Sequence, residues 1–296
     1  MSVTAADRAL WRPRVEQRRR TGRGFVVLCY AATALGLLAL LVLIGDTLVK
    51  GAPYLSWDFL TSYPSRFAER SGVLAALVGT FYVGLIVIVV AFPLGIATAV
   101  WLEEYAAPGA VKSILQTNIG NLAGVPSIIY GMLGLAVFVR ALGLQRSLLA
   151  GGLTIAILVL PIVIINSQEA LRAVPSGLRH ASYALGATRW ETVRHHVLPA
   201  AMPGILTGTI LALSRAIGEA APIILISSIA FIAFLPESLL DSFTILPIQI
   251  FIWVSKPQEA FHAIAASAII VLLALLLAMN AVAIVLRDRA RRGTRW

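Results

Sequence analysis

The hydrophobic residues of this chain lie in six long runs that contain few or no charges. Each run reaches or exceeds the roughly 20 residues that cross a bilayer core of about 30 Å. Backbone polar groups in lipid must be bonded within the protein, and the alternating pattern of a membrane β-barrel is absent. The runs are Phe25–Val49, Val73–Leu102, Ile114–Val139, Leu148–Ser167, Pro203–Ser228 and Ala263–Leu286. They predict an all-α membrane protein with about six transmembrane helices.

Composition strengthens this prediction. Of the 296 residues, 59% are hydrophobic and 13% are charged, whereas soluble domains are about half apolar and a quarter charged. The single cysteine, Cys29, lies inside the first run and allows neither a disulfide framework nor a cysteine metal site.

The net charge of +10 is distributed as an orientation signal. Seven of the 24 Lys and Arg residues lie in Met1–Gly24, one is Lys112, four lie in Gln168–Ala200 and five follow Leu286, while only six lie on the other side. Under the positive-inside rule, both termini are expected in the cytoplasm, which agrees with an even number of crossings. Because the basic clusters flank the spans, we do not expect a nucleic-acid partner.

The runs also divide the chain into segments. We expect a basic cytoplasmic segment at 1–24, an accessory first helix with an aromatic- and proline-rich external loop at 25–72, a five-helix core at 73–287 and a basic cytoplasmic tail at 288–296. Within the core, Phe243–Val254 is too short to span and contains Pro247, so it is expected as an external interfacial or re-entrant piece.

Helix breakers gather in the third run, at Asn121–Ser127. A proline inside a membrane helix frees a carbonyl, which is tolerated only against protein or a water-filled cavity. Tight helix packing is one interpretation, and a kinked gate is the other. In the second, Asn121 and Ser127 would line the substrate path.

A strip of small residues follows the fifth run at every fourth position. Such strips allow two helices to approach closely in lipid. The members are Gly204, Gly208, Ala212, Ala216 and Ala220. We expect the strip at a helix–helix interface, within this subunit or against a partner permease.

Arg215 and Glu219 lie beside this strip, one helical turn apart. An arginine near the bilayer centre costs about 2.5–3.5 kcal/mol, so it should face a pore or a partner charge. The pair is either a salt bridge that fixes packing or part of an anion path in which the arginine binds oxygens with its planar fork.

The segment Gln168–Ala200 is polar and helix-prone. It predicts a helix at Ala181–Leu185 that stops at Gly186, followed by a second helix from about Arg189 that ends before Pro199. A helix–Gly–helix element can serve as a docking surface for a soluble partner, or it can be a simple connector.

Within this segment, His180-Ala-Ser-Tyr-Ala-Leu-Gly186, nine residues and then His196-Val-Leu-Pro199 resemble the EAA loop of ABC importer permeases. The resemblance implies a coupling helix that docks on an ATPase subunit. It assigns this role to His180, Ala181, Ser182, Gly186, Leu198 and Pro199. His180 stands where the family usually has Glu, and His196 where it usually has an aliphatic residue.

Further stretches narrow the resemblance to the PstA family of phosphate permeases over roughly Gly72 to Arg287. They include Arg215-Ala-Ile-Gly-Glu-Ala-Ala-Pro222 and Pro257-Gln-Glu-Ala-Phe-His262. This resemblance implies a MetI-like, type I permease fold in a prokaryotic inner membrane, surrounded by lipid and without a cofactor. It implies three partners: a PstC-type permease, a PstB-type ATPase dimer and a PstS-type phosphate-binding protein.

The sequence gives little support for ATP hydrolysis, metal binding or catalysis by this chain. No Gly-x-x-x-x-Gly-Lys-Ser/Thr loop is present, so the chain is not expected to hydrolyse ATP. The four histidines show no metal-binding spacing, and Glu103–Glu104 is expected as a solvated helix end rather than a catalytic pair. The alternatives are a permease for molybdate or sulfate and, less favoured, a stand-alone secondary transporter, which predicts inverted repeats.

Overall fold

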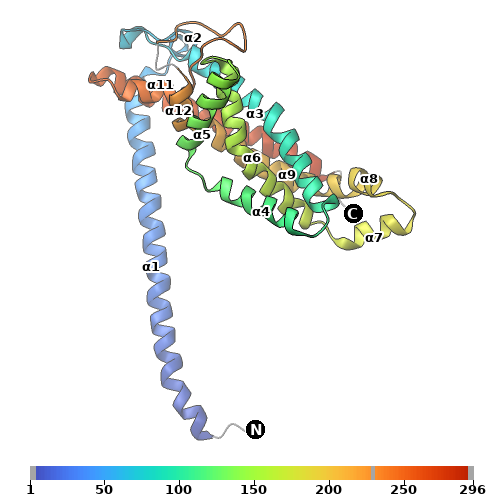
Figure 1. Ribbon diagram of the computed structural model, residues 1–296. Helices are drawn as coiled ribbons and strands as arrows, with labels where there is room; N and C mark the ends of the chain where they lie inside the picture. Colours follow the sequence, from blue (N-terminus) through green and yellow to red (C-terminus); the bar gives the residue numbers. More distant parts are fainter. Residues whose placement is uncertain (1–4, 228–230, 293–296) are drawn as a thin grey trace. The chain divides into compact units, whose positions relative to one another are not determined.

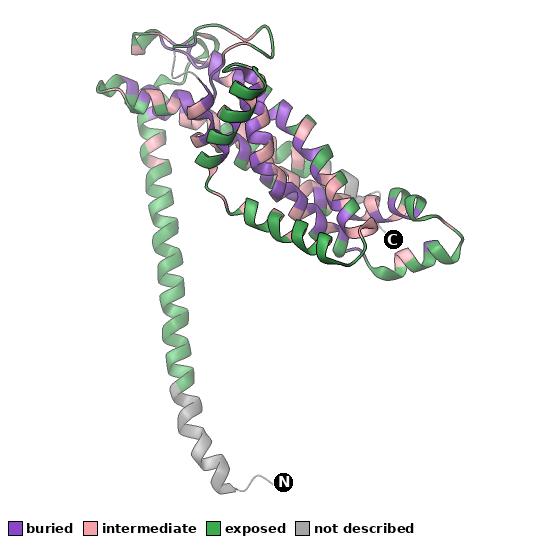
Figure 2. Cartoon of the chain, in the orientation of Figure 1, coloured by how far each residue is buried: buried purple, intermediate pink, exposed green. Residues whose placement is uncertain are grey.

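The computed structural model describes residues 5–227 and 231–292, and the chain divides into two compact units, Met1–Lys50 and Gly51–Trp296. The first unit is almost entirely helix α1 (Ala5–Gly51). Every side chain described from Arg18 to Ile44 is exposed, as the green helix of Figure 2 shows. Within its own unit this apolar helix is therefore uncovered.

The second unit also contains only helices and connecting loops among its described residues. After the short η1 (Ala52–Tyr54), α2 (Trp57–Thr61) and η2 (Ala68–Arg70) come α3 (Leu74–Val100) and its π-helical continuation η3 (Trp101–Tyr105). The middle elements are α4 (Ala110–Ala123), α5 (Ser127–Gly134), η4 (Leu135–Ala141), α6 (Leu148–Arg172), α7 (Ser176–Ala184) and α8 (Arg189–Thr192). The chain continues through η5 (Val193–Val197), α9 (Leu198–Gly218), α10 (Ala221–Ile226), α11 (Leu246–Val254) and α12 (Glu259–Arg292).

Helix α6 is the centre of this unit and packs against both α3 and α9 (Figure 1). Glycines bring α3 and α6 into close contact. A Cβ on Gly95 of α3 would lie 2.7 Å from Val163, and one on Gly152 of α6 would lie 2.7 Å from Ile86. Close approach of this kind holds membrane helices together, since lipid offers no hydrophobic drive between them.

A cluster of buried apolar side chains joins α2, α3, α11 and α12. The hydroxyl of Thr80 on α3 accepts a hydrogen bond of 2.8 Å from the N–H of Leu246, which satisfies a free donor at the start of α11. Trp253, near the end of α11, is fully buried against this cluster. Helix α11 has nine residues and is not among the candidate membrane spans.

Among the described residues, five helices are long and apolar enough to span a membrane, and a bent pair brings the number to six. The expectation of an all-α protein with about six spans is therefore confirmed. The third expected span is not one straight helix, because α4 and α5–η4 meet at a bend of 102°.

The fifth expected span was wrong in its limits: the helix runs from Arg189 to Gly218, and α10 is separate. Ser228, where that span was expected to end, and residues 293–296 of the expected tail lie outside the described residues. The structure separates α1 from the rest at Lys50, inside the expected accessory segment 25–72.

Candidate functional site

The candidate gate at Asn121–Ser127 is the break between α4 and α5. Helix α4 ends at Ala123, and α5 begins at Ser127, directly after Pro126. The hydroxyl of Tyr130 donates a hydrogen bond of 2.8 Å to the carbonyl oxygen of Leu122 across this break. The same carbonyl also accepts a backbone hydrogen bond of 3.2 Å from Val125, so the tyrosine adds a side-chain contact that joins α5 to the end of α4.

A second break lies between α9 and α10. Helix α9 ends at Gly218, and Glu219 has an extended backbone with φ −81° and ψ 112°. The two breaks meet in one apolar cluster that contains Tyr130, Ala216 and Ile223. A Cβ on Gly131 would lie 2.7 Å from the backbone of Pro222, so α5 rests directly on the start of α10.

Arg215 and Glu219 form an ion pair at this second break. Arg215 Nε lies 3.3 Å from Glu219 Oε1, and the arginine side chain is 51% exposed while the glutamate is 20% exposed. Arg215 therefore points away from the packed core of its own unit. Among the described residues, its two terminal guanidinium nitrogens have no hydrogen-bond partner.

The structure does not bring the four expected path residues into direct contact. Asn121 is exposed and Ser127 is half-buried. In the described part of the chain, no hydrogen bond or ion pair connects either of them with Arg215 or Glu219. The two pairs flank neighbouring helix breaks and do not form one closed site.

The small-residue strip of α9 faces α6. A Cβ on Gly204 would lie 2.8 Å from Ala170, and one on Gly208 would collide with the side chain of Asn166. The amide of Asn166 also donates a hydrogen bond of 3.4 Å to the carbonyl oxygen of Gly208. Ala212 and Ala216 of the same strip are buried.

The expected docking segment contains α7 and α8 around a turn at Gly186, and we call α7–α8 the docking element. Gly186 has φ +85°, a backbone conformation that favours glycine. His180 and Ala181 lie exposed on α7, whereas the buried Ser182 hydroxyl bonds that of Thr192 on α8 at 2.9 Å. At the tip of the element, Leu185 is 90% exposed.

Two sequence expectations about this region were wrong. The first helix is α7, Ser176–Ala184, longer than the expected Ala181–Leu185. The second helix does not end before Pro199, because α8 continues through η5 into α9. Leu198 and Pro199 lie inside this continuous helix, directly after the π-helical turn η5.

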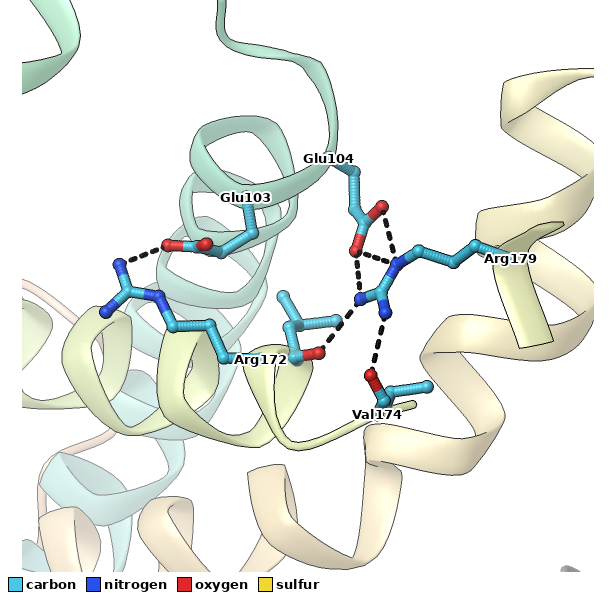
Figure 3. A network of polar contacts seen from close by, with 6 residues as sticks. Glu103, Glu104, Arg172, Val174 and Arg179 are labelled. Atoms are coloured by element: carbon cyan, nitrogen blue, oxygen red, sulfur yellow. Dashed lines mark hydrogen bonds and ion pairs between the residues drawn. The ribbon is translucent and has the colours of Figure 1, made fainter. Parts of the chain in front are cut away.

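The expectation that Glu103–Glu104 is a solvated helix end was also wrong. Their side chains are only 12% and 6% exposed, and each is paired with an arginine from another helix (Figure 3). These arginines, Arg172 and Arg179, follow 69 and 75 residues later in the chain. The only sequence signal was an adjacent acidic pair at the end of a span.

Metal chemistry has no candidate residues in the part of the chain that the structure describes. No group of three or more His, Cys, Asp or Glu side chains there could hold a metal ion.

Residues 91–292 match the family described as binding-protein-dependent transport system inner membrane component. The chain is 31% identical over 309 residues to the phosphate transport system permease protein PstA 1 of Mycobacterium tuberculosis, covering 100% of this chain and 98% of the relative. It is 36% identical over 201 residues to the probable ABC transporter permease protein YqgI of Bacillus subtilis, covering 68% of this chain and 67% of that protein.

Solved structures share the fold. A bacterial ABC transporter involved in the import of the acidic polysaccharide alginate matches with a TM-score of 0.63 and 18% identity, over 94% of this chain and 100% of that one. The methionine ABC transporter MetNI in an inward-facing conformation matches with a TM-score of 0.53 and 21% identity, over 76% and 95%. The expected MetI-like permease fold is confirmed. The chain therefore belongs to the family of inner membrane components of binding-protein-dependent transport systems and, within it, to the PstA group of ABC transporter permeases.

Proposed function

We propose that this chain is a membrane-spanning permease subunit of an ATP-driven phosphate importer and forms half of the translocation path. Its partners are a second permease of the PstC type, a dimer of PstB-type ATPases and an extracytoplasmic phosphate-binding protein of the PstS type. ATP hydrolysis belongs to the ATPases, and both termini of this chain face the cytoplasm. The names of the PstA relatives support phosphate as the substrate.

The observation that supports a role in the path is the half-exposed Arg215 at the break after α9. Its ion pair with Glu219 is long, at 3.3 Å, and exposed. Exposed pairs of this kind contribute only about 0–1 kcal/mol, so a phosphate can replace the carboxylate as the arginine's partner. The two terminal nitrogens of Arg215, which have no hydrogen-bond partner among the described residues, supply the fork that fits two phosphate oxygens.

Glu219 has the complementary role. Its carboxylate neutralises Arg215 when the path is empty, so the arginine does not retain the anion. Asn121 and Ser127, at the neighbouring break, would add hydrogen-bonding groups to the same path.

The docking element supports coupling to an ATPase. Its tip presents two large apolar side chains, Leu185 and Trp190, which are 90% and 58% exposed. Exposed apolar residues next to charged ones are typical of a protein interaction surface. We place the ATPase contact there, with His180, Ala181, Ser182 and Gly186 on or beside it. Leu198 and Pro199 hold the start of α9 behind it.

The test is phosphate uptake into proteoliposomes that contain this chain with its three partners. Arg215→Ala removes a charged hydrogen-bond donor, whose loss costs about 1.5–3 kcal/mol, so uptake should fall about tenfold or more. Arg215→Lys should recover only part of the activity, because lysine lacks the fork. Arg146→Ala removes an exposed arginine from the loop before α6 and should leave uptake unchanged.

Normal uptake by correctly inserted Arg215→Ala and Glu219→Ala variants would contradict a role in the path. Competition by sulfate or molybdate as strong as that by unlabelled phosphate would keep the permease but change its substrate.

A further inference from the structure

Three consecutive residues of η3, which continues α3, each contact an arginine from a different helix. The acidic residues and the tyrosine belong to η3, a π-helix, and π-helical turns occur frequently at functional sites. The contacts are Glu103 with Arg172 of α6, Glu104 with Arg179 of α7 and Tyr105 with Arg189 of α8.

The contact between Glu104 and Arg179 is the most extensive of the three (Figure 3). Arg179 Nη2 lies 2.7 Å from Glu104 Oε1, and Nε lies 3.2 and 3.3 Å from the two carboxylate oxygens. The same guanidinium donates to the carbonyl oxygens of Val174 at 2.8 Å and Leu171 at 2.9 Å. One arginine therefore connects α7 to η3 at the end of α3, to the last turn of α6 and to the link between α6 and α7.

Burial makes this connection rigid. The Arg179 side chain is 19% exposed and that of Glu104 is 6% exposed, so water competes little for the bonds. A planar guanidinium with five N–H donors can hold a carboxylate and two carbonyls at once, whereas a lysine ammonium cannot reproduce that geometry.

The contact between Glu103 and Arg172 differs in what it joins. Glu103 Oε1 accepts from Arg172 Nη2 at 2.6 Å and from Gln168 Nε2 at 2.9 Å, and both donors belong to α6. This contact connects α3 with α6 and does not include α7.

Tyr105 contributes its ring rather than its hydroxyl. The guanidinium carbon of Arg189 lies 5.9 Å from the ring centroid. The hydroxyl is buried and has no hydrogen-bond partner among the described residues.

The docking element is itself held together, because the Ser182 and Thr192 hydroxyls join α7 to α8. A displacement of its tip therefore reaches Arg179 without being absorbed in the element. We propose that Arg179 and Glu104 form a joint that passes movement of the docking element to α3 and α6. The two are positioning residues: they touch neither the substrate nor ATP. This inference rests on the proposed function, in which an ATPase moves that element.

The experiment compares two joint variants with two matched controls in the complete four-component transporter. Arg179→Lys keeps the charge but not the fork, and Glu104→Gln keeps the shape but not the charge. Arg172→Lys alters the neighbouring contact that does not include α7, and Tyr105→Phe removes a hydroxyl that has no partner. For each assembly we would measure the co-purified ATPase subunit, ATP hydrolysis with and without phosphate-loaded binding protein, and phosphate imported per ATP hydrolysed.

The joint predicts that Arg179→Lys and Glu104→Gln retain the ATPase subunit but import about tenfold less phosphate per ATP, which lies within the usual range of coupling between sites. Their ATP hydrolysis should respond less to the binding protein, while both controls stay close to wild type. A purely structural role would lower the amount of assembled transporter and leave the ratio unchanged.

Two results would overturn the joint: an unchanged ratio in both joint variants, or a fall in uptake that only follows loss of the ATPase subunit. Failure of the proposed function is recognised separately, because the wild-type assembly would then import no phosphate. The joint would still be judged by whether the binding protein stimulates ATP hydrolysis less in the variants than in wild type. Equal stimulation would refute it.

Discussion

The contact between the two helix breaks can be tested with one methyl group. Gly131 of α5 is buried against α10, and a Cβ there would lie 2.7 Å from both the Cα and the carbonyl oxygen of Pro222. Ordinary contacts begin at 3.4 Å, so Gly131→Ala leaves a shortfall of 0.7 Å. Both opposing atoms belong to the backbone of Pro222 and cannot rotate away. The two broken spans must therefore separate.

The expected magnitude follows from two opposing effects. Forcing a methyl into a packed site costs about 1–3 kcal/mol, while alanine in a helix regains about 1 kcal/mol relative to glycine. We expect Gly131→Ala to lower the free energy of unfolding by about 1 kcal/mol. Gly84 of α3 is a matched control, since a Cβ there would lie 3.5 Å from the flexible end of Ile217. Gly84→Ala should be neutral or stabilise by up to about 1 kcal/mol.

The assay is equilibrium unfolding in mixed detergent micelles, followed by tryptophan fluorescence. The two variants should differ by about 1–2 kcal/mol, or about five- to thirtyfold in the unfolding equilibrium constant. Phosphate uptake should fall in Gly131→Ala and stay normal in Gly84→Ala. Equal stability and equal uptake would refute the direct contact between α5 and α10.

Three further predictions concern the turn, the bend and the topology. Gly186→Ala should strain the turn by about 1–2 kcal/mol, because Gly186 has a positive φ, and should reduce the amount of ATPase subunit that co-purifies. The control Gly177→Ala, where a Cβ also meets open space, should not reduce it, and equal co-purification in the two variants would contradict a strained docking turn. Tyr130→Phe removes the hydroxyl bridge and leaves the Leu122 carbonyl with its backbone bond from Val125 at 3.2 Å, so it should lower the unfolding free energy by about 1 kcal/mol in the same micelle assay; an unchanged value would argue against the bridge across the bend. In a Cys29→Ser background, a membrane-impermeant maleimide added to right-side-out vesicles should label Phe67→Cys but not Gly22→Cys, and the reverse pattern would invert the proposed orientation.

The transmembrane helices could be predicted because hydropathy alone selects them. Lipid requires about 20 apolar residues for each crossing, and the runs meet that length. The helix break at Asn121–Ser127 could also be predicted, since Gly124 and Pro126 interrupt the helical pattern. The bend of 102° was not, because it depends on Tyr130 and Pro222, which pack only after folding.

The sequence pattern predicted the helix–Gly–helix arrangement of the docking segment but not where its two helices begin and end. Pro199 suggested a helix end, yet one helix runs through it from Arg189 to Gly218, with the π-helical turn η5 directly before Leu198. Glu103 and Glu104 were misjudged for a different reason. A glutamate at the end of a span is indistinguishable from a solvated one until the fold brings a partner arginine to it.

The proposed function of this chain is that of a phosphate permease subunit in an ATP-driven importer. The most direct measurement is uptake of labelled phosphate into vesicles that contain the chain with its PstC-, PstB- and PstS-type partners, with and without ATP on the ATPase side. We predict uptake that requires ATP and every partner and that excess sulfate or molybdate does not reduce. Uptake by this chain alone, driven by an ion gradient without ATP, would show that it is not a subunit of an ATP-driven importer.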